Sequence, residues 1–267
     1  MLPSTLQPLT CFIPFSEATE SYSLPERFTY PFNYTPHPLS LLAATGLQKY
    51  LAQLTDLDHN FGLNENQDGK VIGKMFGVLV VKNQQNELGY LAAFSGKLAG
   101  SNHHANFVPP VFDGLAEGGF LSEGMQELSR INKEISQLKA NNITEDTTKI
   151  EQLQELRRTN SIALQGKLFD QYRFVNKAGK EKPLRQLFLQ ANYSNPPAGA
   201  GECAAPKLLQ YAFMHRLQPI AMAEFWWGLS PKSATWKHGH YYPACLEKCA
   251  PILAHMLEGI VMDERPL

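Results

Sequence analysis

Residues 202–213 read ECAAPKLLQYAF, and residues 238–251 read HGHYYPACLEKCAP. These two stretches hold three of the four cysteines in the chain, and in each of them a cysteine stands at the start of an apolar, helix-like segment. The positive end of a helix favours the thiolate form of a nearby cysteine, and with it metal ligation. If the two helices begin side by side, several thiols meet at one point of the fold.

The neighbouring segments predict an α/β fold. Apolar periodicity predicts helices over 38–54, 183–190, 202–214 and 243–257, and strands over 75–82, 88–94, 167–176 and 219–227. With the region 115–165 set aside, the main order is helix, strand, strand, helix, strand, helix. Because helices on one face of a packed sheet start near each other, we expect the first turns of the last two helices to bring Cys203, Cys245 and Cys249 together.

Composition divides the chain into three parts. Residues 1–37 are rich in proline and aromatic side chains, which excludes a long helix and predicts an extended arm. Residues 38–100 and 166–267 form the α/β core. Between them, residues 115–165 repeat apolar side chains every three or four positions on a polar background. This pattern predicts an inserted antiparallel helical hairpin, coiled-coil-like with a thin apolar seam, through which the chain could form a homodimer.

The cysteine pattern resembles the zinc-dependent cytidine deaminase fold. In that fold a His/Cys-Ala-Glu motif opens one helix, and Pro-Cys-x-x-Cys opens the next. The motifs map onto Cys203, Ala204 and Ala205, and onto Pro243, Cys245 and Cys249. The resemblance implies a deaminase-like mixed sheet covered by helices.

The same resemblance implies a zinc site. Its ligands would be Cys203, Cys245 and Cys249, completed by His238 or His240. Two alternatives stay open from the residues alone: the cysteines are buried and inert, as cysteine often is, and the histidines are exposed or hydrogen-bonded.

Departures from the motif argue against deamination. Ala205 stands where the general acid/base glutamate should be, and the second cysteine pair is spaced CxxxC instead of CxxC. Without that glutamate no group moves protons to the leaving amine. Glu202 and Glu224 are the nearby carboxylates that a deaminase-like reaction would have to use, and neither occupies the motif position.

A second resemblance covers more of the chain. The strings GECAAPKLLQYAF, MAEFWWG and HGHYYPACLEKCAPIL are similar to the N-terminal region of long bacterial RluA-type pseudouridine synthases, and the match runs from PFNYTPHPLSLLAA onward. In that family the region precedes the catalytic domain, which carries an HRLD aspartate. Here HRLQ, residues 215–218, has no carboxylate.

The RluA-type resemblance implies an accessory module of an RNA-modifying isomerase. The module would position the RNA or the catalytic domain expected beyond Leu267, and would itself lack the synthase active site. RNA is then a partner through the parent synthase. The alternative is a zinc-dependent deaminase-like hydrolase acting on a nucleobase or a small molecule.

Charge and hydropathy limit the partners. The net charge is −1, without the basic excess of a protein that grips nucleic acid over a wide surface, so any RNA contact is expected to be local. The cations available on the hairpin are Lys133, Lys139, Lys149, Arg157 and Arg158, with acidic residues interleaved. There is no apolar run long enough to cross a bilayer and no signal peptide, which predicts a cytoplasmic protein with no membrane partner.

Overall fold

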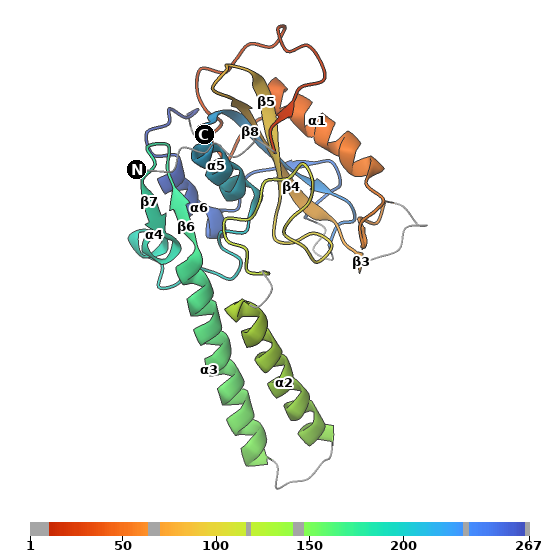
Figure 1. Cartoon of the computed structure of the whole chain (residues 1–267), viewed down its shortest axis with the longest axis vertical. Helices are drawn as coiled ribbons and strands as arrows, with labels where there is room; N and C mark the ends of the chain where they lie inside the picture. The colour runs from red at the N-terminus through yellow and green to blue at the C-terminus, as the bar shows by residue number, and fades with distance from the viewer. Residues whose placement is uncertain (1–10, 64–69, 116–118, 141–146, 232–234, 265–267) are drawn as a thin grey trace. The chain divides into compact units, whose positions relative to one another are not determined.

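The computed structural model describes residues 11–63, 70–115, 119–140, 147–231 and 235–264. Within those ranges it contains six α-helices, a five-stranded sheet and two two-stranded sheets (Figure 1). The chain divides into two compact units, one of residues 1–111 with 173–267 and the other of residues 112–172. No helix in the described ranges combines the length and apolarity needed to cross a membrane.

The elements follow the predicted order, with five short strands added: β1, β2, β3, β7 and β9. The helices are α1 (Pro38–Gln53), α2 (Phe120–Ala140), α3 (Thr147–Gln171), α4 (Leu184–Gln190), α5 (Ala204–Met214) and α6 (Leu246–Met256). The strands are β1 (Ile13–Pro14), β2 (His59–Asn60), β3 (Lys70–Val71), β4 (Lys74–Lys82), β5 (Leu88–Phe94), β6 (Arg173–Val175), β7 (Glu181–Pro183), β8 (Gln218–Trp227) and β9 (Tyr241–Tyr242). The described part of the expected arm, residues 11–37, contributes β1 and is otherwise irregular, while its first ten residues lie outside the described ranges.

The main sheet has the order β1-β5-β4-β8-β9, and every neighbouring pair is antiparallel. The expectation of a mixed sheet is therefore wrong. A tight turn joins β4 to β5, and the Asn83 side-chain oxygen holds it by accepting from the backbone N–H groups of Gln85 and Glu87. On the other side of β4, β8 runs in the opposite direction, so the three long strands alternate.

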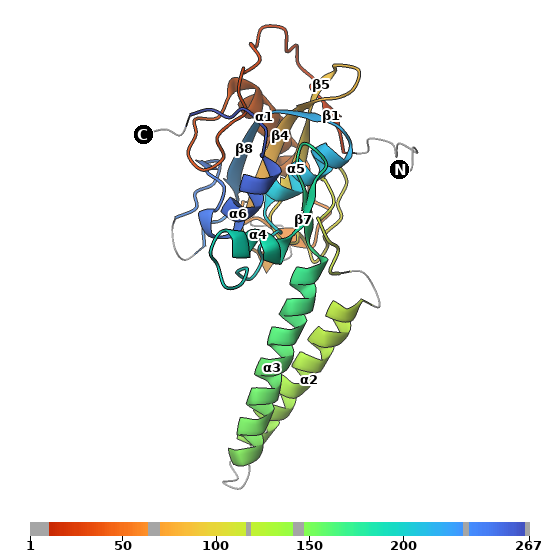
Figure 2. The same ribbon diagram turned by 90° about the vertical axis from the view of Figure 1, so that its left-hand side faces the viewer.

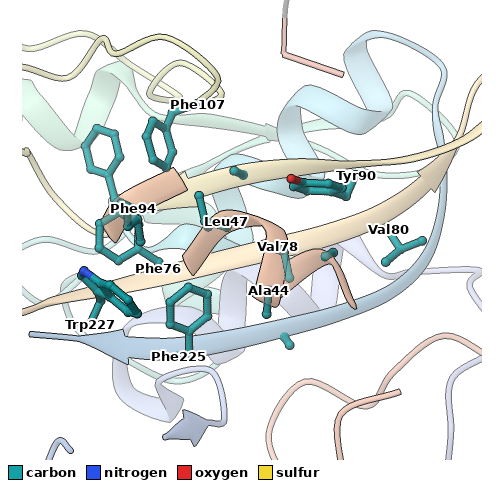
Figure 3. Close-up of a cluster of buried hydrophobic side chains, with 14 of the residues drawn as sticks. Ala44, Leu47, Phe76, Val78, Val80, Tyr90, Phe94, Phe107, Phe225 and Trp227 are labelled. Carbon is teal, nitrogen blue, oxygen red and sulfur yellow. The ribbon is translucent and has the colours of Figure 1, made fainter. Parts of the chain in front are cut away.

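The two faces of the sheet are covered by different helices because side chains alternate along each strand. On one face, Ala44 and Leu47 of α1 pack over Phe76, Val78 and Phe225 (Figure 3). His37 caps α1, since its Nδ1 accepts from the backbone N–H of Leu39 at 3.2 Å. The helix thus closes an aromatic-rich core over β4 and β8.

On the opposite face, α5 lies against β4, β5 and β8, and α6 packs beside α5 (Figure 2). Gly77 of β4 permits this close approach. A Cβ atom at Gly77 would lie 2.9 Å from the Cβ of Ala204 and 3.4 Å from the Cγ of Glu224. The first turn of α5 therefore rests almost directly on the strand.

The second unit is the predicted helical pair, in which α2 and α3 pack against each other. Ile131, Ile135 and Phe169 are buried on its helices. The strand predicted over residues 167–176 is wrong for most of its length, because α3 continues to Gln171 and the strand spans only Arg173–Val175. The spacing of Leu168, Phe169 and Tyr172 fits the three-to-four-residue period of a helix as well as the two-residue period of a strand. The segment was predicted as a strand because only the second period was considered.

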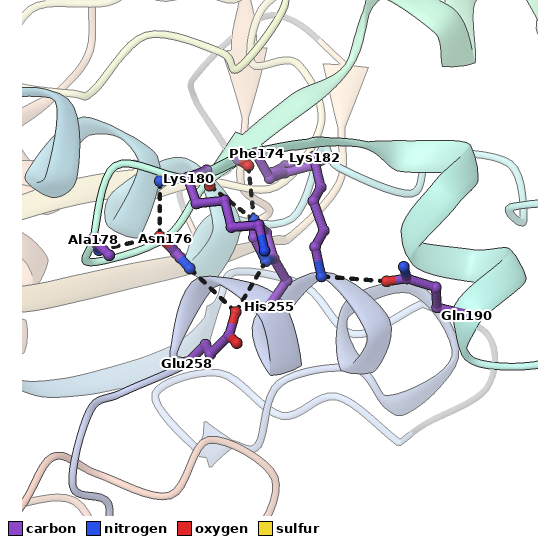
Figure 4. Close-up of polar contacts among 8 residues, drawn as sticks. All are labelled: Phe174, Asn176, Ala178, Lys180, Lys182, Gln190, His255 and Glu258. Carbon is purple, nitrogen blue, oxygen red and sulfur yellow. Dashed lines mark hydrogen bonds and ion pairs between the residues drawn. The ribbon is translucent and has the colours of Figure 1, made fainter.

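A polar network fastens the β6–β7 hairpin to α6 (Figure 4). The Asn176 side-chain oxygen accepts from the backbone N–H groups of Ala178 and Lys180, and its Nδ2 donates to Glu258 at 3.2 Å. The Nε2 of the buried His255 lies 3.1 Å from the carbonyl oxygens of both Phe174 and Lys180. Since carbonyls only accept, this nitrogen carries the ring proton.

Replacing Asn176 with alanine is expected to lower the free energy of unfolding by about 2 kcal/mol. The substitution removes three hydrogen bonds and leaves two backbone N–H groups of a tight turn without their acceptor. Urea unfolding monitored by circular dichroism measures the loss. Lys180→Ala is the matched control, because these contacts involve only its backbone, and a comparable loss in that variant would contradict the role assigned to Asn176.

Candidate functional site at the first turn of α5

The N-terminus of α5 is hydrogen-bonded to the segment that follows β5. The backbone carbonyl of Glu202 accepts from Gly96 N–H at 2.8 Å, so the segment after β5 lies against the start of the helix. Cys203 is the N-cap residue, in an extended conformation, and its side chain does not cap the helix. The thiol is thereby left available for other contacts, and it is partly exposed.

Glu224 lies directly beneath this turn. It stands opposite Gly77 in the sheet, and its Oε1 accepts from the backbone N–H of Ala205 at 3.2 Å. The residue is only 4% exposed. Burial raises the pKa of the Glu224 carboxyl to about 7, although the bond from Ala205 acts in the opposite direction. The carboxyl is therefore close to its midpoint at neutral pH, a property that candidate acid/base groups share.

A tyrosine closes the other side of Glu224. The backbone N–H of Glu224 donates to the Tyr34 hydroxyl at 2.9 Å, and that hydroxyl donates to the carbonyl of Tyr242 at 3.0 Å. Burial, with Glu224 nearby, raises the pKa of Tyr34 well above its ordinary value. This hydroxyl is fixed as a neutral donor and acceptor, and it ties residues 34, 224 and 242 together.

A buried thiol lies on α6, the helix that packs against α5. This residue, Cys249, is fully buried. Interaction with the Cys203 thiol and burial raise the pKa of the Cys249 thiol, and the charges of Glu224 and Cys245 add to the effect. The prediction that these two helices pack side by side is confirmed, whereas the convergence of the three thiols stays a prediction. Cys245, the N-cap of α6, is exposed.

The predicted zinc ligands have different surroundings. In the part of the chain that the structure describes, no group of three His, Cys, Asp or Glu side chains is placed to hold a metal ion. His238 Nδ1 accepts from the backbone N–H of Gly228 at 3.0 Å, its ring lies 4.4 Å from Trp227, and His240 is exposed. Cys203 and Cys249 by themselves fall short of the four ligands of a structural zinc site. Zinc ligation stays a prediction.

Lys207 completes the site and was missed in the sequence. One turn into α5, it is 3% exposed, and its Nζ donates to the carbonyls of Phe94 and Gly96, both at 2.9 Å. The ammonium also lies 4.9 Å from the centre of the Phe94 ring. Burial lowers the pKa of Lys207 to about 8, while Glu202 and Cys203 act to raise it. The available signal was a lysine inside the apolar run APKLLQYAF.

A surface pocket of about 460 Å³ lies in the same unit. Arg27, Lys177 and Arg216 line it together with apolar side chains at the C-terminal end of α5 and the start of β8. Arg216 has a φ of 56°, a left-handed conformation that costs a non-glycine residue about 1 kcal/mol. Arg27 already pairs with Glu264 at 3.4 Å. None of the cysteines lines this pocket.

The chain was compared with known proteins. It matches no protein-family model, and searches of curated proteins and of solved structures found no significant match.

Proposed function

We propose that the chain is an accessory N-terminal module of an RluA-type RNA pseudouridine synthase, non-catalytic itself, which positions the RNA or the catalytic domain. The family is proposed because residues 201–213, 222–228 and 238–253 are similar to the N-terminal region of these synthases. The structural observation behind the positioning role is the α2–α3 pair, a unit whose two helices of 21 and 25 residues bury few side chains. Such a pair presents most of its surface to a partner.

The exposed surface of this pair favours a protein partner over RNA. Met125 of α2 and Ile162 of α3 are 53% and 57% exposed, so each helix offers an apolar side chain to a partner. Three of its cations form ion pairs: Arg130 contacts Glu127 at 2.8 Å, Lys149 contacts Glu134 at 3.2 Å, and Arg158 contacts Glu155 at 2.8 Å. Phosphate recognition needs uncompensated positive charge. The catalytic domain is therefore the better candidate for contact with the hairpin.

Binding measurements test this assignment. We expect the chain to bind a separately expressed RluA-type catalytic domain, and expect Met125→Glu and Ile162→Glu each to weaken binding by about tenfold, or ~1.4 kcal/mol, because a charge replaces a desolvated apolar contact. Leu189→Glu is the matched control, since Leu189 is equally exposed, at 62%, but belongs to the other unit. Calorimetric titration gives the affinities.

Three other results would indicate a different partner or no partner. Steeply salt-dependent binding of a structured RNA that Arg216→Glu weakens would assign the positioning role to RNA and the cationic pocket. A doubled mass in sedimentation, abolished by Ile162→Glu, would make a second copy of the chain the occupant of the hairpin. Binding to none of these partners contradicts the proposal.

The deaminase-like hydrolase is a second candidate because of Glu224. The helix–strand–strand–helix–strand–helix order and the pairing β5-β4-β8 are compatible with that fold, and a carboxyl with a pKa of about 7 lies against Ala205, where the family has its glutamate. The described residues do not form a ready-made metal group. One equivalent of zinc that survives dialysis and is lost in Cys203→Ser would favour this candidate over the accessory module.

A further inference from the structure

We propose that the pocket at the C-terminal end of α5 binds a small organic anion, a molecule with an apolar body and a carboxylate or phosphate group. Its volume of about 460 Å³ lies within the range of roughly 300–1,000 Å³ that is typical of small-molecule sites. The inference goes beyond the proposed function and does not depend on it.

The pocket is built by four segments that lie far apart in the chain. They are residues 25–28, Lys177, the segment 213–220 and residues 259–261. The backbone N–H of Phe28 donates to the Val261 carbonyl at 2.8 Å, and the Phe28 carbonyl accepts from Asp263 N–H at 2.8 Å. These bonds join the arm to the segment after α6, so the two walls that they form are fixed before any ligand arrives.

Positive charge dominates the polar part of the lining. Arg27, Lys177 and Arg216 stand against Glu26, which is the one acid among the described residues that line the pocket. Arg27 pairs with Glu264 at 3.4 Å. Within the described ranges, by contrast, the side chains of Lys177 and Arg216 form no hydrogen bond or ion pair. An anionic group that accepts from the Arg216 guanidinium would supply the missing partner, and two parallel bonds would fix its orientation.

Arg216 occupies a backbone position that favours glycine. The end of α5 is a Schellman motif, in which Arg216 N–H donates to the Phe213 carbonyl at 3.2 Å and Leu217 N–H donates to the Ala212 carbonyl at 2.8 Å. The residue at the place of Arg216 adopts a left-handed conformation, here with a φ of 56°. Glycine adopts it without a steric cost, and arginine does not. What arginine adds at this position is its side chain, which lines the pocket.

The apolar part of the lining favours a small molecule over an RNA backbone. Phe28 and Ile220 are buried, Phe213 is half-buried, and Val261 is 67% exposed. These side chains offer apolar surface beside the cations, where the body of an organic anion is shielded from water. A phosphate backbone needs a row of cations, and the chain as a whole has a net charge of −1.

Titration of the full chain with anilinonaphthalene sulfonate tests the proposal, because this aromatic anion fluoresces in apolar surroundings. We expect one saturable site. Arg216→Gly should weaken binding about tenfold, the loss expected for one charge-assisted contact. It should unfold at a temperature no lower than that of the wild type, because glycine suits the φ of 56°. Lys177→Met should weaken binding to a similar degree. Lys180→Met is the matched control, since Lys180 is exposed in the same hairpin and does not line the pocket.

Displacement of the probe identifies the class of ligand. Phenyl phosphate and phenylacetate share an aromatic body and differ in the anionic group, whereas benzyl alcohol has a similar body without the charge. We expect at least one of the two anions to displace the probe at concentrations at which benzyl alcohol has no effect. The anion that competes at the lower concentration identifies the preferred head group.

Three results would overturn the proposal. They are equal displacement by benzyl alcohol, an affinity for the probe that is unchanged in both Arg216→Gly and Lys177→Met, and a structured RNA that displaces the probe when neither small anion does. Because none of these readouts involves a catalytic domain, failure of this proposal is separate from failure of the accessory-module proposal.

Discussion

Glu224→Gln is expected to make the chain more stable than the wild type by roughly 3 kcal/mol at pH 8, and to change its stability little at pH 4. The pKa of Glu224 is about 7 in the folded chain against an ordinary value of 4.5. Between these values the unfolded carboxyl has lost its proton and the folded one retains it, so the stability of the wild type falls as pH rises from 4.5 to 7. Glutamine keeps an oxygen for the Ala205 N–H and carries no charge.

Urea unfolding from pH 4 to 8 measures this difference. The other titrating groups are common to both proteins and largely cancel. Glu26→Gln, at an exposed position outside the site, should follow the wild type within about 0.5 kcal/mol at every pH. If Glu224→Gln is the less stable protein at pH 8, the folded carboxylate must gain a favourable partner, such as a cation at the thiols, and the interpretation of a cost from burial is wrong.

Periodicity was sufficient to predict most of the fold. The helix at Pro38–Gln53 and the strands at Lys74–Lys82 and Leu88–Phe94 follow directly from apolar steps of three to four and from runs bounded by turn residues. The continuation of α3 to Gln171 was missed because a short segment with adjacent apolar residues satisfies both periods. A mixed sheet was wrongly predicted because the direction of β8 relative to β4 depends on where β8 joins the sheet. Local sequence patterns contain no information on that position.

The sequence predicted only those features of the site that follow from the order of helices and strands along the chain. Two helices that follow strands on one face were predicted to lie side by side, and α5 and α6 do pack against each other. The position of Glu224 beneath Ala205 depends on the register that sets it opposite Gly77, and register is a property of paired strands. The carbonyls that hold Lys207 lie more than a hundred residues away in the chain. Such long-range contacts leave little trace in a single sequence.

Lys207→Met is expected to remove a rise in stability of roughly 3 kcal/mol that the wild type shows between pH 7 and 10.5. Burial lowers the pKa of Lys207 from 10.5 to about 8 in the folded chain. Between these values the unfolded chain holds a proton that the folded chain has released, so the free energy of unfolding increases with pH. Methionine has a similar length and no proton to lose.

The difference between the two unfolding free energies, plotted against pH, isolates this group. Lys97→Met is the matched control, because Lys97 is exposed in the segment that also provides the Gly96 carbonyl, and its curve should run parallel to that of the wild type. Parallel curves for Lys207→Met would mean that the ammonium stays charged up to pH 10.5. The bonds to the Phe94 and Gly96 carbonyls and the Phe94 ring would then offset its burial. In that case Lys207 is a fixed, buried positive charge one turn from Cys203.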